Sequence, residues 1–412
     1  MLNSENIREL AFVAEIDAIE PIEGSDNCEC AVVGGWRVMV RKGEFKRRDV
    51  AVYFEVDSKL DSTNPAFAFM ANKKYKVLPQ RYTFGGKGNF ISQGLLMSAQ
   101  SLGWTAFYDD FYGETYIIDE ENKSHSVRDE SRFLTKKLKV TYATAEDNIR
   151  KAPAADMSSI KNVLNRYPKI AKRFGKIIVK NKILSKLFMF FFAKRASKRD
   201  AWPTHIAEKT DCERAQNMPY ILQDKTPFVA SEKVDGSSFT AAAERTKFGK
   251  IKYYVCSRNV SFKNEEQTSY YDTNIWYEMY NKYNLKTILT SILKDLRLKN
   301  VAIQAEIYGE GVQKRDYSTA DHKMAVFHIV TNREKFPMDK VVEICNKYGL
   351  PHVPIIDWNY ILPDTMEELQ EYVESAPSLI DGKEKEGIVF YDKKTGQKYF
   401  KFVSPNFLLH FH

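Results

Sequence analysis

The chain has 412 residues, enough for two or three domains with substantial hydrophobic cores. Its 43% hydrophobic and 13% aromatic content excludes a disordered tail, a collagen and a low-complexity scaffold. The net charge is +8, but residues 161–199 carry 13 Lys and Arg and no acidic residue. The net charge of the other residues is therefore −5. This basic block predicts a contact with a polyanion such as a nucleic acid backbone, and docking to a protein partner or an acidic surface is the alternative.

Cysteine usage and hydropathy indicate the compartment. Five cysteines at 28, 30, 212, 256 and 345 match no zinc-binding spacing, which favours reduced thiols in a cytoplasmic protein, within the host cell if the chain is viral. The N-terminal sequence does not resemble a signal peptide. The most apolar run, residues 187–193, is far shorter than the roughly 20 residues that span a bilayer.

The first part of the chain, residues 1–118, is expected to be β-structure. Short alternating runs separated by turn residues are typical of a small barrel or sandwich. The expected strands are residues 11–16, 30–33, 36–40, 50–55 and 94–97. The glycine-rich stretch at 83–89 lacks the spacing of a Walker loop, so we expect an exposed loop and at most a weak phosphate site.

The next part, residues 119–205, changes in composition. Residues 119–131 are polar and loop-like, and a Lys-rich stretch with helical periodicity follows, interrupted at Pro168 and Gly175. We expect a basic, largely helical linker or insertion.

Residues 206–412 form a mixed segment dominated by strands. The expected strands are 228–232, 238–243, 251–256, 301–308, 324–330, 387–391 and 399–403, and the expected helices are 275–298, 338–348 and 365–375. The whole chain is therefore predicted to be α+β, with a front barrel, a basic helical insertion and a C-terminal domain rich in antiparallel sheet.

A set of ordered motifs lies in this last segment. Lys233-Val-Asp235-Gly236 directly follows an apolar strand, and five further motifs come after it in the chain. These are Ser257-Arg258-Asn259, Ala305-Glu306 through Gln313, Phe327-His328-Ile-Val330, Glu384-Lys-Glu386-Gly387 and Lys398-Tyr-Phe-Lys401. Their order and spacing resemble motifs I, Ia, III, IIIa, IV and V of the covalent nucleotidyltransferases, which include ATP-dependent ligases and capping enzymes.

Three further stretches narrow the resemblance to the RNA ligases. The lead-in from Lys209 to Asn217 and the ending from Phe400 to Leu409 resemble those of RNA ligases. The N-terminal part, with Gly35-Trp36 and residues 42–45, resembles the OB domain of the fifth RNA ligase family. DNA ligases and capping enzymes carry their OB domain after motif V, whereas only 11 residues follow Lys401 here. The resemblance thus implies an N-terminal OB-like barrel and a nucleotidyltransferase domain over 206–412.

The resemblance also implies a role for each motif residue. Lys233 is the expected nucleophile, Lys401 assists it at the α-phosphate, and carboxylates surround Mg²⁺ or Mn²⁺: Asp235, Glu306 and Glu386. The expected nucleotide contacts are Glu232 and Phe327 at the adenine, Arg258 and Glu306 at the ribose or phosphate, and Lys209 and Arg214 at the β- and γ-phosphates. Two departures from the pattern are His328, where an acidic or amide residue is common, and Tyr399, where a second lysine is common.

The function implied is ATP-dependent RNA ligation. A lysine attacks the α-phosphorus of ATP, AMP passes to a 5′-phosphate end, and a 3′-hydroxyl displaces AMP. Nearby positive charge would favour the neutral amine that the attack requires. We expect a monomer that acts on nicked duplex or broken RNA ends in RNA repair. The alternatives are a non-catalytic OB-type nucleic-acid-binding protein with a degenerate ATP module, a DNA ligase and a capping guanylyltransferase.

Overall fold

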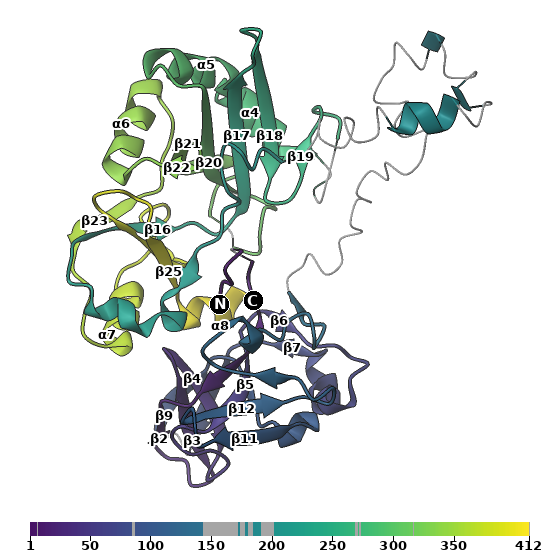
Figure 1. Cartoon of the computed structure of the whole chain (residues 1–412). Coiled ribbons are helices and arrows are strands. Elements are labelled where there is room, and N and C mark those ends of the chain that lie inside the picture. The colour runs from purple at the N-terminus through teal and green to yellow at the C-terminus, as the bar shows by residue number, and fades with distance from the viewer. Residues whose placement is uncertain are drawn as a thin grey trace.

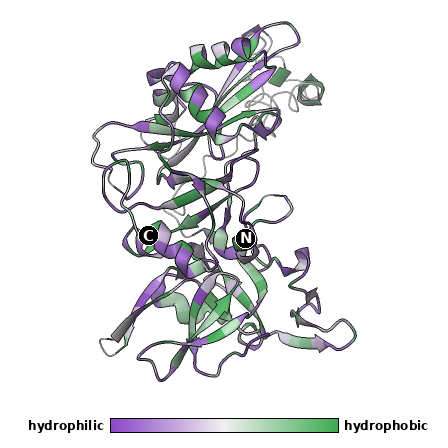
Figure 2. Cartoon of the chain, turned by 90° about the vertical axis from the view of Figure 1, so that its left-hand side faces the viewer, coloured by the Kyte–Doolittle hydropathy of each residue, from purple (hydrophilic) through white to green (hydrophobic). Residues whose placement is uncertain are grey.

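The protein folds into two lobes, and both ends of the chain lie at their junction (Figure 1). This computed structural model describes residues 1–5, 7–84, 87–142, 172–173, 178–179, 184–190, 202–267, 271, 273–315 and 317–411. Figure 2 shows hydrophobic residues along the strands of both lobes and hydrophilic residues on turns and on the outer helix faces. The two lobes thus have the layered cores expected of an α+β protein.

The N-terminal lobe is built from short strands in several small sheets. The strand orders are β1-β5-β10, β2-β3-β4, β11-β12-β13, β14-β6-β7 and β8-β9. The strands are β1 (Ala11–Glu15), β2 (Ala18–Pro21), β3 (Cys28–Val33), β4 (Trp36–Arg41), β5 (Val50–Phe54), β6 (Ser58–Lys59), β7 (Lys76–Val77), β8 (Gln80–Phe84), β9 (Lys87–Ser92), β10 (Leu95–Met97), β11 (Thr105–Asp109), β12 (Glu114–Ile118), β13 (Ser124–His125) and β14 (Thr141–Tyr142). Three 3₁₀ helices join them: η1 (Pro65–Lys73), η2 (Gln100–Leu102) and η3 (Glu130–Arg132).

This lobe extends further along the chain than the expected boundary at residue 118. Leu134, Leu138 and Val140 are buried in the same core cluster as Val52 and Phe54 of β5. In addition, β14 pairs with β6 in an antiparallel ladder. The polar stretch after residue 118 therefore leads back into the lobe, because the apolar residues that follow it complete the core.

The glycine-rich stretch differs in part from its expected form as an exposed loop. Thr83 and Phe84 end β8 and Lys87 begins β9, and these strands pair as a hairpin from Gln80↔Ser92 to Phe84↔Lys87. The stretch therefore contributes residues to both strands of this ladder.

The C-terminal lobe contains two larger sheets. One has the order β15-β25-β24-β16-β23 and the other β19-β18-β17-β20-β21-β22. The strands are β15 (Glu213–Arg214), β16 (Phe228–Lys233), β17 (Ser237–Arg245), β18 (Ile251–Ser257), β19 (Ser261–Phe262), β20 (Asn300–Tyr308), β21 (Lys323–Thr331), β22 (Glu334–Lys335), β23 (Ile355–Tyr360), β24 (Gly387–Asp392) and β25 (Tyr399–Val403). All seven expected strands of this segment are present, and the longer ones have the buried runs that predict central strands.

Helices pack on these sheets. They are α4 (Ile275–Lys282), α5 (Leu285–Asp295), α6 (Met338–Tyr348), α7 (Met366–Glu374) and α8 (Pro405–Phe411), with the 3₁₀ helices η5 (Ala215–Asn217) and η6 (Pro219–Gln223). The single helix expected over 275–298 is two helices, because Asn284 adopts a left-handed conformation with φ of 47° between them. A capping box begins α7, where Thr365 and Glu368 satisfy each other's backbone N–H groups.

The two lobes share a hydrophobic cluster. Val403 at the end of β25 and Leu408 of α8 pack with Phe12, Trp36 and Tyr53 of the barrel. Of the basic block at 161–199, the described stretches 172–173, 178–179 and 184–190 are helical, and the rest lies outside the described residues.

Candidate active site

Lys233 is the last residue of β16, which lies between β24 and β23 in the five-stranded sheet. It lies opposite Gly387 of β24, and Glu386 immediately precedes that strand. The Lys233 Nζ atom is 2.5 Å from Glu386 Oε2. Burial lowers the pKa of Lys233, but the carboxylates of Glu386 and Glu306 outweigh burial and raise this pKa to about 12. Without a ligand, the proposed nucleophile is therefore held as an ammonium ion.

Two glycines let the backbones pass closely here. A Cβ on Gly236 would lie 2.1 Å from the Ile307 carbonyl oxygen, and a Cβ on Gly387 would lie 2.1 Å from the Phe402 carbonyl oxygen. No side chain fits either position. The Asp235-Gly236 turn joins β16 to β17, so the absence of a side chain brings Glu306 of β20 to the nucleophile.

The three predicted metal carboxylates lie within electrostatic reach of one another. Burial, followed by the negative charge of Glu386, raises the pKa of Asp235. Burial raises the pKa of Glu306 to about 8, and Glu386 and Asp235 add to the shift. Such crowding favours a bound cation. Among the described residues, however, no three His, Cys, Asp or Glu side chains form a ready chelating group. The arrangement suits an ion that keeps several waters, as magnesium does.

A second charge cluster, which we call the Asp211 cluster, brings together residues of several elements: Asp211 precedes β15, Lys401 is on β25, Arg258 follows β18 and Arg8 precedes β1. Asp211 accepts hydrogen bonds from Arg258 at 2.7 Å, Lys401 at 3.2 Å and Arg8 at 3.3 Å. Burial would raise the pKa of Asp211, but Lys401, Arg8 and Arg258 hold it well below its usual range. The pKa of Lys401 is lowered, mainly by burial. The structure thus brings the two predicted phosphate contacts Arg258 and Lys401 together around one carboxylate.

Lys209 joins this group, whereas Arg214 does not. Lys209 Nζ donates to Asn259 Oδ1 at 3.1 Å, and burial followed by the charge of Arg258 lowers the pKa of Lys209. Arg214 is buried, donates to Asp57 at 3.0 Å and lies over the Trp36 ring. The expected phosphate role of Arg214 is therefore corrected, since its guanidinium serves the contact between the lobes.

The predicted adenine contacts lie on neighbouring strands. The Glu232 side chain accepts from Ser378 Oγ and Leu379 N and is buried, so only its backbone carbonyl is left for a nucleotide. Phe327 is partly exposed and packs against the large core cluster. The departure at His328 is a buried ring between Phe327 and Tyr399, and burial lowers the pKa of His328 far enough to keep it neutral.

The other departure, Tyr399, has a definite structural role. Its hydroxyl donates to the Asp211 carbonyl oxygen at 2.9 Å. Lys398 does not replace the missing lysine, because it pairs with Asp224 at 2.6 Å. Tyr399 therefore anchors the backbone of the Asp211 cluster where a second phosphate-binding lysine is common.

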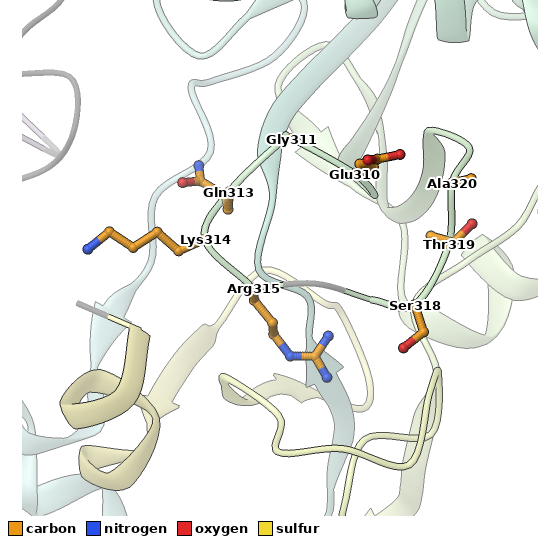
Figure 3. Close-up of a pocket in the computed structure, with 8 residues that line it drawn as sticks. All are labelled: Glu310, Gly311, Gln313, Lys314, Arg315, Ser318, Thr319 and Ala320. Carbon is orange, nitrogen blue, oxygen red and sulfur yellow. The ribbon is translucent and has the colours of Figure 1, made fainter.

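The loop between β20 and β21 supports the nucleophile turn. Gln313 donates to the Gly236 carbonyl oxygen at 2.9 Å, and the Tyr317 hydroxyl accepts from the Asp235 N–H at 2.7 Å. The Arg315 guanidinium lies 3.7 Å from the Tyr317 ring centroid and pairs with Asp381. Figure 3 shows this loop around a pocket of about 480 Å³, with Gln313 and Lys314 on one limb and Ser318 and Thr319 on the other.

Sequence reasoning missed Arg8, Asp211, Arg315 and Tyr317 as functional candidates. Tyr317 and Asp211 lie within stretches that resemble RNA ligases, but no role was assigned to them. The position of Asp211, two residues after Lys209, could have indicated that it lies near the phosphates. Arg8 had no local signal, since its partner Asp211 is 203 residues away in the sequence.

Two family models match parts of this chain. Residues 226–403 match the RNA ligase family, and residues 10–98 match an OB-fold domain family. The C-terminal lobe is thus similar to RNA ligases, and the N-terminal lobe is similar to OB-fold domains. The fold class and the N-terminal OB-fold lobe are those expected from the sequence. The family model that the C-terminal lobe matches is that of an enzyme, RNA ligase.

Solved structures show the same fold over the full chain. A lysine-to-methionine variant of Naegleria gruberi RNA ligase with AMP and Mn is 23% identical, with a TM-score of 0.68, over 98% of this chain and 99% of that one. An arginine-to-alanine variant with ATP and Mn is 24% identical, with a TM-score of 0.68 and the same coverage. The enzyme with PPi is 21% identical, with a TM-score of 0.65 and the same coverage.

A search of curated proteins gave no match. None of the helices in the described part of the chain has both the length and the apolarity to cross a membrane.

Proposed function

We propose that this protein joins 3′-hydroxyl and 5′-phosphate RNA ends with ATP, through lysyl-AMP and adenylylated RNA. The observation that carries the proposal is the position of Lys233. Its amine lies beside Glu386 and within the field of Glu306, and Lys401 of the Asp211 cluster is on β25 of the same sheet.

In the first step, the Lys233 amine forms a bond to the α-phosphorus of ATP, and the bond to pyrophosphate breaks. The amine must first lose a proton, and Glu386 is the acceptor within hydrogen-bond distance. A bound Mg²⁺ or Mn²⁺ would neutralise phosphate charge and the carboxylates of Asp235, Glu306 and Glu386. Once these carboxylates face a cation, they no longer favour the ammonium form of Lys233.

The phosphates of ATP would be held by cations on neighbouring elements. Lys401 of β25 suits the α-phosphate, and Arg258 offers a planar pair of donors to phosphate or ribose. Lys209 lies next to Arg258 and suits the outer phosphates. Arg214 is left out because its charge is neutralised in a buried pair with Asp57.

The adenosine would lie between the two sheets. The Glu232 backbone is the proposed contact to the adenine edge, the Phe327 ring would lie over the base, and Glu306 would also reach the ribose. The RNA would be held by the OB-fold lobe, because such barrels bind strands with a basic groove and aromatic platforms. Repair of broken RNA, a monomeric state and a cytoplasmic location complete the proposal.

Covalent labelling with α-labelled ATP tests this function. Wild-type protein should gain label with Mg²⁺ or Mn²⁺, and Lys233→Ala should gain none. Lys225→Ala is the matched control, because Lys225 lies just before the same strand but pairs with Asp364. Label on Lys233→Ala would disprove the assignment.

The substrates separate the remaining alternatives. Labelling by GTP and not by ATP would indicate a capping enzyme, and sealing of DNA 3′-ends in preference to RNA 3′-ends would indicate a DNA ligase. A wild-type chain that binds RNA and takes no label would be a non-catalytic binding protein.

A further inference from the structure

Arg8 reaches from the N-terminal lobe into the Asp211 cluster. It lies three residues before β1, and its side chain is only 5% exposed. Its Nη1 atom donates to Glu55 Oε2 at 3.0 Å, and Glu55 follows β5 and is fully buried. Its Nη2 atom donates to the Cys212 carbonyl oxygen at 2.9 Å. The guanidinium is therefore fixed on one side by the barrel and on the other by the lead-in to β15.

The same guanidinium makes two contacts with the Asp211 carboxylate. Nη2 lies 3.3 Å from Oδ1, and Nε lies 3.4 Å from Oδ2. The side-by-side contact restricts rotation of the carboxylate, as paired contacts between arginine and a carboxylate do. The orientation of Asp211 is thus set by a residue of the other lobe.

Asp211 in turn contacts the two cations that face the nucleotide. Its Oδ1 accepts from Lys401 and its Oδ2 from Arg258. The backbone is also fixed, because β15 pairs in parallel with β25 and places Arg214 opposite Lys401. Movement of Asp211 would therefore be passed directly to both cations.

We propose that Arg8 is a positioning residue for lysyl-AMP formation, which acts by fixing Asp211 so that Lys401 and Arg258 are placed for the phosphates. The inference rests on the proposed function, since it assigns the phosphates to Lys401 and Arg258. It couples the OB-fold lobe to the first chemical step, which involves no RNA. Preorganised charge of this kind is effective because it needs no rearrangement during the reaction.

A purely structural role for Arg8 is the competing explanation. In that case Arg8→Ala would reduce the folded fraction and leave the labelling rate per folded molecule unchanged. If Arg8 acts through Asp211, its removal should slow labelling at saturating ATP by roughly tenfold, within the range of couplings between contacting residues. Arg8→Lys retains the charge and should recover part of the rate.

The experiment measures labelling of the full chain by α-labelled ATP over a range of ATP concentrations, with the folded fraction taken from thermal unfolding. The variants are Arg8→Ala, Arg8→Lys, Asp211→Asn and the double variant. Arg37→Ala is the matched control, because it removes another arginine contact between the lobes, the 2.8 Å pair with Glu367. It should label at the wild-type rate.

The double variant gives the decisive comparison. In the Asp211→Asn background, Arg8→Ala should change the rate by less than about twofold, because its target is already gone. A wild-type rate for Arg8→Ala alone, or the same loss in both backgrounds, would overturn the inference while the proposed function stands. A wild-type protein that takes no label would overturn both.

Discussion

The two charge clusters of the candidate site have opposite arrangements of charge. Around Lys233, one amine faces the carboxylates of Glu386 and Glu306, and its pKa is raised against the effect of burial. Around Asp211, one carboxylate faces three cations, and its pKa is lowered against the effect of burial. The first cluster has excess negative charge, which suits a metal ion, and the second has excess positive charge, which suits phosphates. Under the proposed function, each cluster carries the charge opposite to that of the part of a metal–nucleotide complex that it would bind.

The largest expected effects come from removing one residue of each cluster. Glu386→Ala and Lys401→Ala should each slow lysyl-AMP formation by about 100-fold, the scale seen when a preorganised electrostatic contact is lost. The measurement is the initial rate of labelling by α-labelled ATP. Lys398→Ala is the control, since Lys398 pairs with Asp224. Near-normal rates in both variants would remove both clusters from the mechanism.

Neutralising the carboxylate of the Asp211 cluster should destabilise the protein. Asp211→Asn removes the negative charge that Arg8, Arg258 and Lys401 share, at a cost of about 3 kcal/mol near pH 7. Since the folded pKa of Asp211 lies below its unfolded value, the stability it provides is present above that unfolded pKa and is lost as the pH falls. Urea unfolding over a pH series measures both. A variant as stable as wild type near neutral pH would contradict this account.

Neutralising a carboxylate beside Lys233 should instead stabilise the protein, and the change in the free energy of unfolding should be smaller. Burial raises the pKa of Glu306 to about 8, so the wild-type protein loses stability as the pH rises from the ordinary pKa of a glutamate to about 8. Glu306→Gln should therefore be more stable by about 1 kcal/mol near pH 8, with the difference vanishing near pH 4. Thermal unfolding in EDTA provides the measurement, and Glu371→Gln on the exposed face of α7 is the control. Equal or lower stability of Glu306→Gln near pH 8 would be inconsistent with a strained carboxylate.

Motif residues could be placed from sequence because strand periodicity and motif order are local properties. Lys233, Glu306, Glu386 and Lys401 lie at or beside strands that alternating apolar residues predicted. Ion-pair partners of these side chains that lie far away in the sequence could not be predicted in this way. Arg214 illustrates the limit, since its charge suits a phosphate and only the fold shows Asp57 already bound to it.

The expected boundary at residue 118 failed for a similar reason. The composition changes there, but the later apolar residues return to the core of the same lobe, and composition does not reveal where they pack. The strand β23, over Ile355–Tyr360, was not predicted, because its partly exposed residues lack a buried run.

The shared hydrophobic cluster has a consequence for biosynthesis. Phe12 is made early, whereas Val403 and Leu408, which cover the same cluster, are translated almost four hundred codons later. Domains begin to fold as they leave the ribosome. Part of the apolar surface of the barrel therefore stays exposed to solvent until these residues have been translated. The nascent chain therefore cannot complete its front lobe before its catalytic lobe. This order of synthesis makes the growing chain a natural client for chaperones that bind exposed hydrophobic surface.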